Sequence, residues 1–121
     1  IRLVSDLQTI NVPKEGAAIR YAPEFSPGGL NVNFVSKQDP THYQIRTYER
    51  GVENETLACG TGAVAAAIAM HSSGETEGAT EVCLTARGGI LTVSFEFTDG
   101  HYHKIFLKGP AIHVFSGSIE L

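Results

Sequence analysis

The residues from Ala63 to Met70 form a continuous run without a single polar side chain, and most of them are alanine. Such a composition favours an α-helix, and a helix that is apolar all round is usually buried on all sides. Small alanine side chains also allow a sheet to approach and wrap closely around the helix. The run therefore predicts a fold organised around one central helix.

The rest of the chain is dominated by short β-strand patterns separated by turns. Apolar residues alternate with polar ones most clearly in residues 90–97, and residues 43–48 are rich in aromatic and β-branched side chains. Residues 1–7 with 10–12 read as one strand or a strand and turn, residues 13–16 as a turn, and residues 17–20 as a short helix or turn. Further strands are expected at residues 30–35, 81–86, 102–107 and 112–115.

These elements predict one domain, residues 1–121, of the α+β class, with a curled, largely antiparallel sheet wrapped around the central helix. The chain has 121 residues, 42% of them hydrophobic, which is enough for one modest core. Because Met70 is the only methionine, Ile1 is not a translation start, and we expect an N-terminal portion to be missing.

Charge and motifs narrow the classes of function. The net charge is −4 and the basic residues are scattered, so we expect neither a nucleic-acid partner nor binding to a membrane surface. No apolar run reaches the ~20 residues of a membrane-spanning helix. The five histidines show no metal-ligand spacing, and nucleotide-binding glycine motifs are lacking, so we expect no metal and no cofactor. Two cysteines in a chain of this size favour reduced thiols and a cytoplasmic location.

Cys59 is the strongest candidate for chemistry. It lies in the sequence Ala-Cys-Gly-Thr-Gly directly before the apolar run, where a helix dipole favours a thiolate and free backbone N–H groups bind anions. Gly60 and Gly62 would let a ligand approach the backbone, and Thr61 adds a hydroxyl. The alternative is an inert buried cysteine, which is the interpretation that we prefer for Cys83 in the strand at 81–86.

Other candidates surround this sequence. Glu49 and Arg50 end the strand at 43–48, and an arginine at such a place suits recognition of a carboxylate. Asn31 and Asn33 share one face of the strand at 30–35. In each case a solvated surface position is the alternative.

Together these residues resemble the diaminopimelate epimerase family, in its C-terminal half. The resemblance rests on five pieces that occur in the family's order: Leu30–Phe34, Tyr48–Val52, Glu55–Ala63, Gly88–Leu91 and Leu107–Ala111. It implies an isomerase that interconverts the LL and meso forms of diaminopimelate in bacterial lysine biosynthesis, with no cofactor or metal. It also implies a fold of two similar lobes with the substrate between them.

The resemblance also assigns roles to residues. Cys59 corresponds to one of two catalytic cysteines, and Gly60 and Thr61 to backbone donors for the α-carboxylate of the substrate. Asn31 and Arg50 correspond to contacts with the distal carboxylate. Glu49 corresponds to a partner of the substrate ammonium that also influences the ionisation of the thiol.

This chain departs from the family in one respect that matters. The family's second catalytic cysteine comes from an N-terminal lobe, and Cys83 does not match it. We therefore expect the isolated chain to be inert, and its partners to be a small dicarboxylic diamino acid, the missing N-terminal lobe and, as an open question, a second copy in a homodimer. Two alternatives remain: another racemase or isomerase of the same fold, such as a proline racemase or phenazine-pathway type, and a non-catalytic single-lobe binding module.

Overall fold

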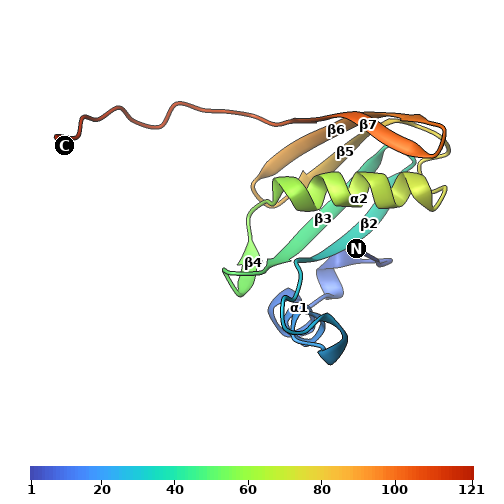
Figure 1. The fold of residues 1–121 in the computed structure, drawn as a ribbon, viewed down its shortest axis with the longest axis horizontal. Coiled ribbons are helices and arrows are strands. Elements are labelled where there is room, and N and C mark those ends of the chain that lie inside the picture. The colour runs from blue at the N-terminus through green and yellow to red at the C-terminus, as the bar shows by residue number, and fades with distance from the viewer.

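The computed structural model describes all 121 residues and shows one curled sheet with a helix on each side (Figure 1). The α-helices are α1 (Val12–Arg20) and α2 (Gly60–Ser72), and two short 3-10 helices, η1 (Leu7–Thr9) and η2 (Pro23–Phe25), flank α1. None of these helices has the length and apolar character needed to cross a membrane. The seven strands are β1 (Arg2–Leu3), β2 (Val32–Asp39), β3 (His42–Glu49), β4 (Asn54–Thr56), β5 (Glu81–Ala86), β6 (Gly89–Thr98) and β7 (His101–Lys108).

The sheet has the order β1-β2-β3-β5-β6-β7, with β4 paired to β3 outside this order. Four of the pairings are antiparallel, whereas β1 with β2 and β3 with β5 are parallel. The parallel pairing of β3 with β5 requires a crossover, and α2 provides it. The predicted class, an α+β fold with a curled and largely antiparallel sheet, is confirmed, and the sheet remains open.

Helix α2 lies along the concave side of the sheet, as the apolar run predicts, but it is not buried on all sides. Ala63, Ala66 and Ala67 have no exposed surface and pack against the strands. Ala65 on the opposite side of the helix is exposed, and Ile68 is half-buried. The expectation of burial all round is wrong because the open sheet covers only one side of α2.

Helix α1 includes residues 17–20, which were predicted as a short helix or turn, but it begins earlier than expected. Residues 10–12 were assigned to a strand and 13–16 to a turn, and these assignments are wrong from Val12 onward. The Asn11 side chain accepts a hydrogen bond from the Lys14 amide at 3.2 Å, and the Glu15 carboxylate accepts one from the Asn11 amide at 3.1 Å. Pro13 sits in the first turn of the helix, where its missing N–H costs nothing. The Asn-Val-Pro sequence is therefore a helix start with reciprocal capping rather than punctuation between strands.

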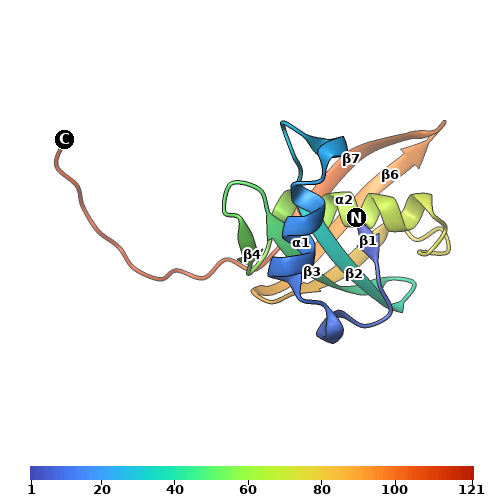
Figure 2. The same ribbon diagram turned by 90° about the horizontal axis from the view of Figure 1, so that it is seen from below.

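The two helices cover opposite faces of the β2–β3 part of the sheet (Figure 2). On the α2 face, Val35 and Ile45 belong to a core cluster of 11 buried residues. On the α1 face, Val32 and Phe34 pack with Tyr48 and with residues of η1 and α1. Both faces of β2 are therefore covered, which explains why its first five residues are all buried.

The two ends of the chain differ most from expectation. The first strand is only Arg2–Leu3, and the strand predicted at 30–35 begins at Val32 and continues to Asp39. The strand predicted at 112–115 is wrong: residues 109–121 have no regular structure and extend away from the body of the molecule (Figures 1 and 2). Ile112 and Phe115 are more than 80% exposed. An apolar alternating sequence does not make a strand without a neighbour to pair with.

Candidate active site

Cys59 is the N-cap residue of α2. Its backbone is extended (φ −137°, ψ 113°), and its carbonyl accepts the first helical hydrogen bond from the Ala63 amide at 2.9 Å. No side chain caps the helix, and the amides of the first turn have no acceptor within the helix. The structure thus brings the half-buried thiol and the free N–H groups of Gly60 and Thr61 to one place, where an anion is favoured.

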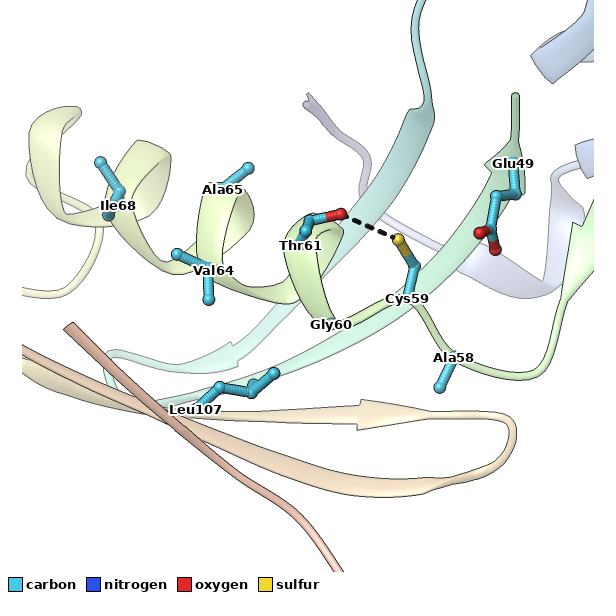
Figure 3. Close-up of a pocket in the computed structure, with 9 residues that line it drawn as sticks. All are labelled: Glu49, Ala58, Cys59, Gly60, Thr61, Val64, Ala65, Ile68 and Leu107. Carbon is cyan, nitrogen blue, oxygen red and sulfur yellow. Dashed lines mark hydrogen bonds between the residues drawn. The ribbon is translucent and has the colours of Figure 1, made fainter. Parts of the chain in front are cut away.

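Two polar side chains contact the thiol. The Thr61 hydroxyl lies 3.4 Å from Cys59 Sγ, and Figure 3 shows the two groups pointing toward each other. Asn31 Nδ2 donates toward Cys59 Sγ at 3.9 Å. The thiol is therefore in contact with two polar groups at the start of α2.

The thiol opens onto a cavity of about 740 Å³ between the start of α2 and β7. Glu49, the last residue of β3, lies on the side of Cys59 away from the helix, and its carboxylate faces this space (Figure 3). Much of the remaining wall is apolar, from Ala58, Val64, Ala65, Ile68 and Leu107. The site therefore combines a small number of polar groups with an apolar surround, as small-molecule sites commonly do.

Neither Asn31 nor Arg50 lines this cavity, although Asn31 contacts the thiol that does. Asn31 Oδ1 accepts the backbone amide of Arg50 at 2.8 Å, so Asn31 bridges Arg50 and the thiol. The Arg50 guanidinium is exposed and donates to the carbonyl of Gly28 at 3.1 Å. Asn31 also contributes to a second cavity, of about 340 Å³, on the side toward the N-terminus.

Asn33, for which a solvated surface position was the alternative, is instead buried beneath the first turn of α2. It accepts a hydrogen bond from the Thr47 hydroxyl at 2.7 Å, and a Cβ on Gly62 would clash with its side-chain oxygen. Gly62 therefore allows the helix start to approach β2 closely. The shared face of Asn31 and Asn33 was predicted correctly, and this face turns out to be the one toward α2.

The cavity wall from Val64, Ile68 and Leu107 was not predicted as part of a site. Val64 and Ile68 lie in the apolar run, which offered no signal for the side left open by the sheet. Leu107 comes from β7, which is distant in sequence from α2. Only the topology brings it to the helix start.

Cys83 lies half-buried in β5, with Thr92 Oγ1 at 3.7 Å from its sulfur, and it does not line the cavity. Both cysteines are free thiols. The position of Cys83 in a strand, away from the cavity, agrees with the structural role that was expected for Cys83.

Comparison with known proteins gives a consistent result. Residues 1–114 match the sequence model of the family described as Diaminopimelate epimerase. The chain is 46% identical to the diaminopimelate epimerase of Flavobacterium psychrophilum over 119 residues, which cover 98% of this chain and 46% of that protein. It is 44% identical to that of Aquifex aeolicus over 117 residues, or 97% of this chain and 41% of that protein. The chain thus spans less than half the length of these relatives.

Among solved structures, the fold resembles that of a Bacillus anthracis phenazine biosynthesis protein of the PhzF family. The TM-score is 0.58, and the likeness covers 87% of this chain and 32% of that chain at 18% identity. At this identity the likeness concerns the fold alone. From the family match and from the identity to curated relatives, the chain belongs to the diaminopimelate epimerase family.

Proposed function

We propose that this chain is the C-terminal lobe of a diaminopimelate epimerase and that Cys59 is one of its two acid–base cysteines. The observation that carries the proposal is the position of Cys59 as N-cap of α2, facing the cavity and contacted by the Thr61 hydroxyl and the Asn31 amide. The relatives described above are named for this activity.

Inversion of a carbon requires a base on one face and an acid on the other. In our proposal the Cys59 thiolate takes the α-proton of one stereoisomer, and the thiol returns a proton when the reaction runs in the other direction. The substrate α-carboxylate binds the free amides of Gly60 and Thr61. There it accepts the negative charge that develops on the carbanion, close to the positive end of the α2 dipole.

The remaining polar groups fit the other charges of a diamino dicarboxylic acid. The Glu49 carboxylate, which lines the same cavity, would bind a substrate ammonium group. Asn31 and Arg50, which are linked to each other, would bind the distal carboxylate after the Arg50 guanidinium turns away from the Gly28 carbonyl. The scheme uses only side chains and backbone amides, without a metal or cofactor.

One thiol reaches one face of the α-carbon. The second base must therefore come from outside these 121 residues, and we assign it to an N-terminal lobe that packs over the open side of α2. The chain's short coverage of its relatives supports this division. It follows that the isolated chain is inert.

The experiment compares the full-length protein, including the N-terminal half, with two cysteine variants. Removal of one acid–base group typically costs about 10²–10⁴-fold in rate, so Cys59→Ala is expected to lose at least that much LL-to-meso conversion and α-hydrogen exchange in deuterated water. Cys83→Ala is the matched control and should keep its activity. Retained activity in Cys59→Ala would refute the catalytic assignment. Exchange catalysed by the 121-residue chain alone would refute the two-lobe scheme.

A further inference from the structure

Glu53 closes the turn between β3 and β4 in an unusual backbone conformation. Its φ of 58° lies in the left-handed region, which is unfavourable for a residue with a side chain. Its amide donates to the Glu49 carbonyl at 2.8 Å, and its carboxylate accepts the Gly51 amide at 2.7 Å. Glu53 thus folds the chain back on both sides of Arg50.

The same carboxylate reaches the end of α1. It accepts hydrogen bonds from Arg20 Nε at 3.2 Å, from the Tyr48 hydroxyl at 3.4 Å and from the Tyr21 hydroxyl. The Arg20 guanidinium lies 4.8 Å from the centre of the Tyr21 ring. We call these residues, Glu53 with Arg20, Tyr21, Tyr48 and Gly51, the Glu53 clamp.

Arg20 extends the clamp to the loop before β2. Gly29 has a φ of 63°, and a Cβ at this position would occupy the place of Arg20 Nη1, so the guanidinium rests on the glycine. The adjacent Gly28 carbonyl accepts a hydrogen bond from Arg50 Nη1. The Asn31 side chain in the same loop accepts a hydrogen bond from the Arg50 backbone amide. The loop with Asn31 and the turn with Arg50 are thereby both held against the end of α1.

The charge of the Glu53 carboxylate is satisfied by groups of the protein itself. Hydrogen bonds from Tyr21 and the Gly51 amide, together with Arg20, lower the pKa of Glu53 to about 2, so the carboxylate is charged throughout the neutral range. Glu53 lines neither cavity. Its negative charge therefore faces cations and hydroxyls of the protein rather than the space where a carboxylate ligand would bind.

We propose that Glu53 is a positioning residue. It holds the backbone of the Arg50 turn and the loop with Asn31 in the place from which both residues reach the distal carboxylate of the substrate, once the Arg50 guanidinium has left the Gly28 carbonyl. The inference rests on the proposed function, because it assumes that Arg50 and Asn31 form the distal site. Glu53 acts through these residues and does not touch the substrate.

The test uses the full-length protein with Glu53→Gln, Glu53→Gly and Asp39→Asn. Asp39 is the matched control, because its carboxylate likewise accepts a hydrogen bond from a backbone amide in a turn. Its pKa is also lowered to about 2, mainly by the Thr41 amide. Asp39 lies in the turn of the β2–β3 hairpin, at the end far from Arg50. We expect Glu53→Gln to raise KM for diaminopimelate about tenfold with kcat changed less than twofold, as for loss of one charge-assisted contact to a binding element. Asp39→Asn should leave both constants unchanged.

Glu53→Gly separates the clamp from the backbone angle, because glycine adopts the left-handed conformation without strain. The proposal requires that Glu53→Gly raise KM at least as much as Glu53→Gln. If Glu53→Gly binds substrate as well as the parent protein, the residue acts only through its backbone, and the positioning role is wrong. An unchanged KM in Glu53→Gln, beside a raised KM in Arg50→Ala, would also overturn it.

A second readout does not depend on activity. Amide hydrogen exchange at Arg50 and Gly51 should accelerate at least about tenfold in Glu53→Gln and remain unchanged in Asp39→Asn. If the parent protein does not epimerise diaminopimelate, the proposed function fails by itself. The exchange measurement then still tests whether Glu53 holds the Arg50 turn. Equal exchange in the parent protein and in Glu53→Gln would mean that Glu53 does not hold the turn.

Discussion

The two faces of the β2–β3 hairpin are stabilised in different ways. The α2 face is packed with aliphatic and aromatic side chains around the alanines of α2, and its buried polar pair, Asn33 with Thr47, lies at the helix start. The α1 face has a smaller apolar cluster that is bordered by charged groups. There Arg46 binds Glu55 with two hydrogen bonds, at 2.6 and 2.8 Å, and donates to the carbonyls of Leu7 and Ile10.

The difference between the faces shows that close packing positions one part of the site and that charged groups position the other part. Cys59 and the amides behind it are held by close packing of α2 on the sheet. Glu49 and Arg50 are held by ion pairs and hydrogen bonds on the other face, through β4 and the end of α1. The α2 face should therefore be sensitive to changes in volume and insensitive to pH, and the α1 face should behave in the opposite way.

The largest effect is expected from a cavity on the α2 face. Leu84 has no exposed surface, and Leu84→Ala should lower the free energy of unfolding by about 4 kcal/mol, equally at pH 7 and pH 4. Denaturant unfolding of the chain at both pH values measures this. Ile90→Ala is the control, because Ile90 is 57% exposed, and its loss should be below about 1 kcal/mol. If the loss of unfolding free energy in Leu84→Ala depended strongly on pH, the proposed difference between the two faces would be wrong.

A charge change on the α1 face should have a smaller effect that depends on pH. Glu55→Gln should cost about 2 kcal/mol at pH 7, below the usual cost of breaking a buried ion pair because the Arg46 side chain is 22% exposed. Hydrogen bonds from Arg46, and also the charge of Arg87, lower the pKa of Glu55 below its ordinary value. The stabilisation by Glu55 is therefore fully present above about pH 4.5 and is lost as the pH falls through its folded-state pKa.

The difference in unfolding free energy between the parent chain and Glu55→Gln should accordingly shrink in acid. Glu96→Gln is the control, since Glu96 pairs with Lys104 on an exposed hairpin, and it should produce no measurable change. A difference that stays constant from pH 7 to pH 3 would show that Glu55 acts by packing, and the two faces would then not differ in kind.

A smaller effect is expected at the helix start, where α2 contacts β2. Gly62→Ala should cost about 1–2 kcal/mol, because the added methyl group displaces the Asn33 side chain and lifts the first turn of α2. Thermal unfolding measures the cost, and Gly28→Ala, which adds a methyl group in open space, is the control. A gain in stability, as helix propensity alone would predict, would contradict the close approach.

The smallest effect is expected from the segment that belongs to neither face. Deletion of residues 111–121 should change the free energy of unfolding of the isolated chain by less than about 0.5 kcal/mol, because this segment is exposed along its whole length. A larger loss in denaturant unfolding would show that the segment packs on the body of the molecule.

The sequence was informative where local pattern and tertiary environment agree. The apolar run at 63–70 and the alternation at 90–97 each have a single reasonable interpretation, and Cys59 was identified because its neighbours define a helix start. Two predictions from sequence pattern were wrong. Residues 10–12 were assigned to a strand, although Asn11 caps a helix together with Glu15, four residues away. Residues 112–115 were assigned to a strand, although no neighbouring strand is present to pair with them. The Glu53 clamp could not be foreseen, because Arg20 and Tyr21 come from α1 and its end, which are distant in sequence from Glu53.

The parallel pairing of β3 with β5 has a consequence for how the molecule folds. Only three residue pairs join these strands, whereas seven join β2 to β3 and six join β5 to β6. Each antiparallel hairpin closes a short loop and can form early, but their union must first enclose residues 50–80 at a larger entropic cost. Cys59 lies within that connection. The late step that completes the sheet is therefore expected to be the step that brings the thiol to Glu49 and Asn31.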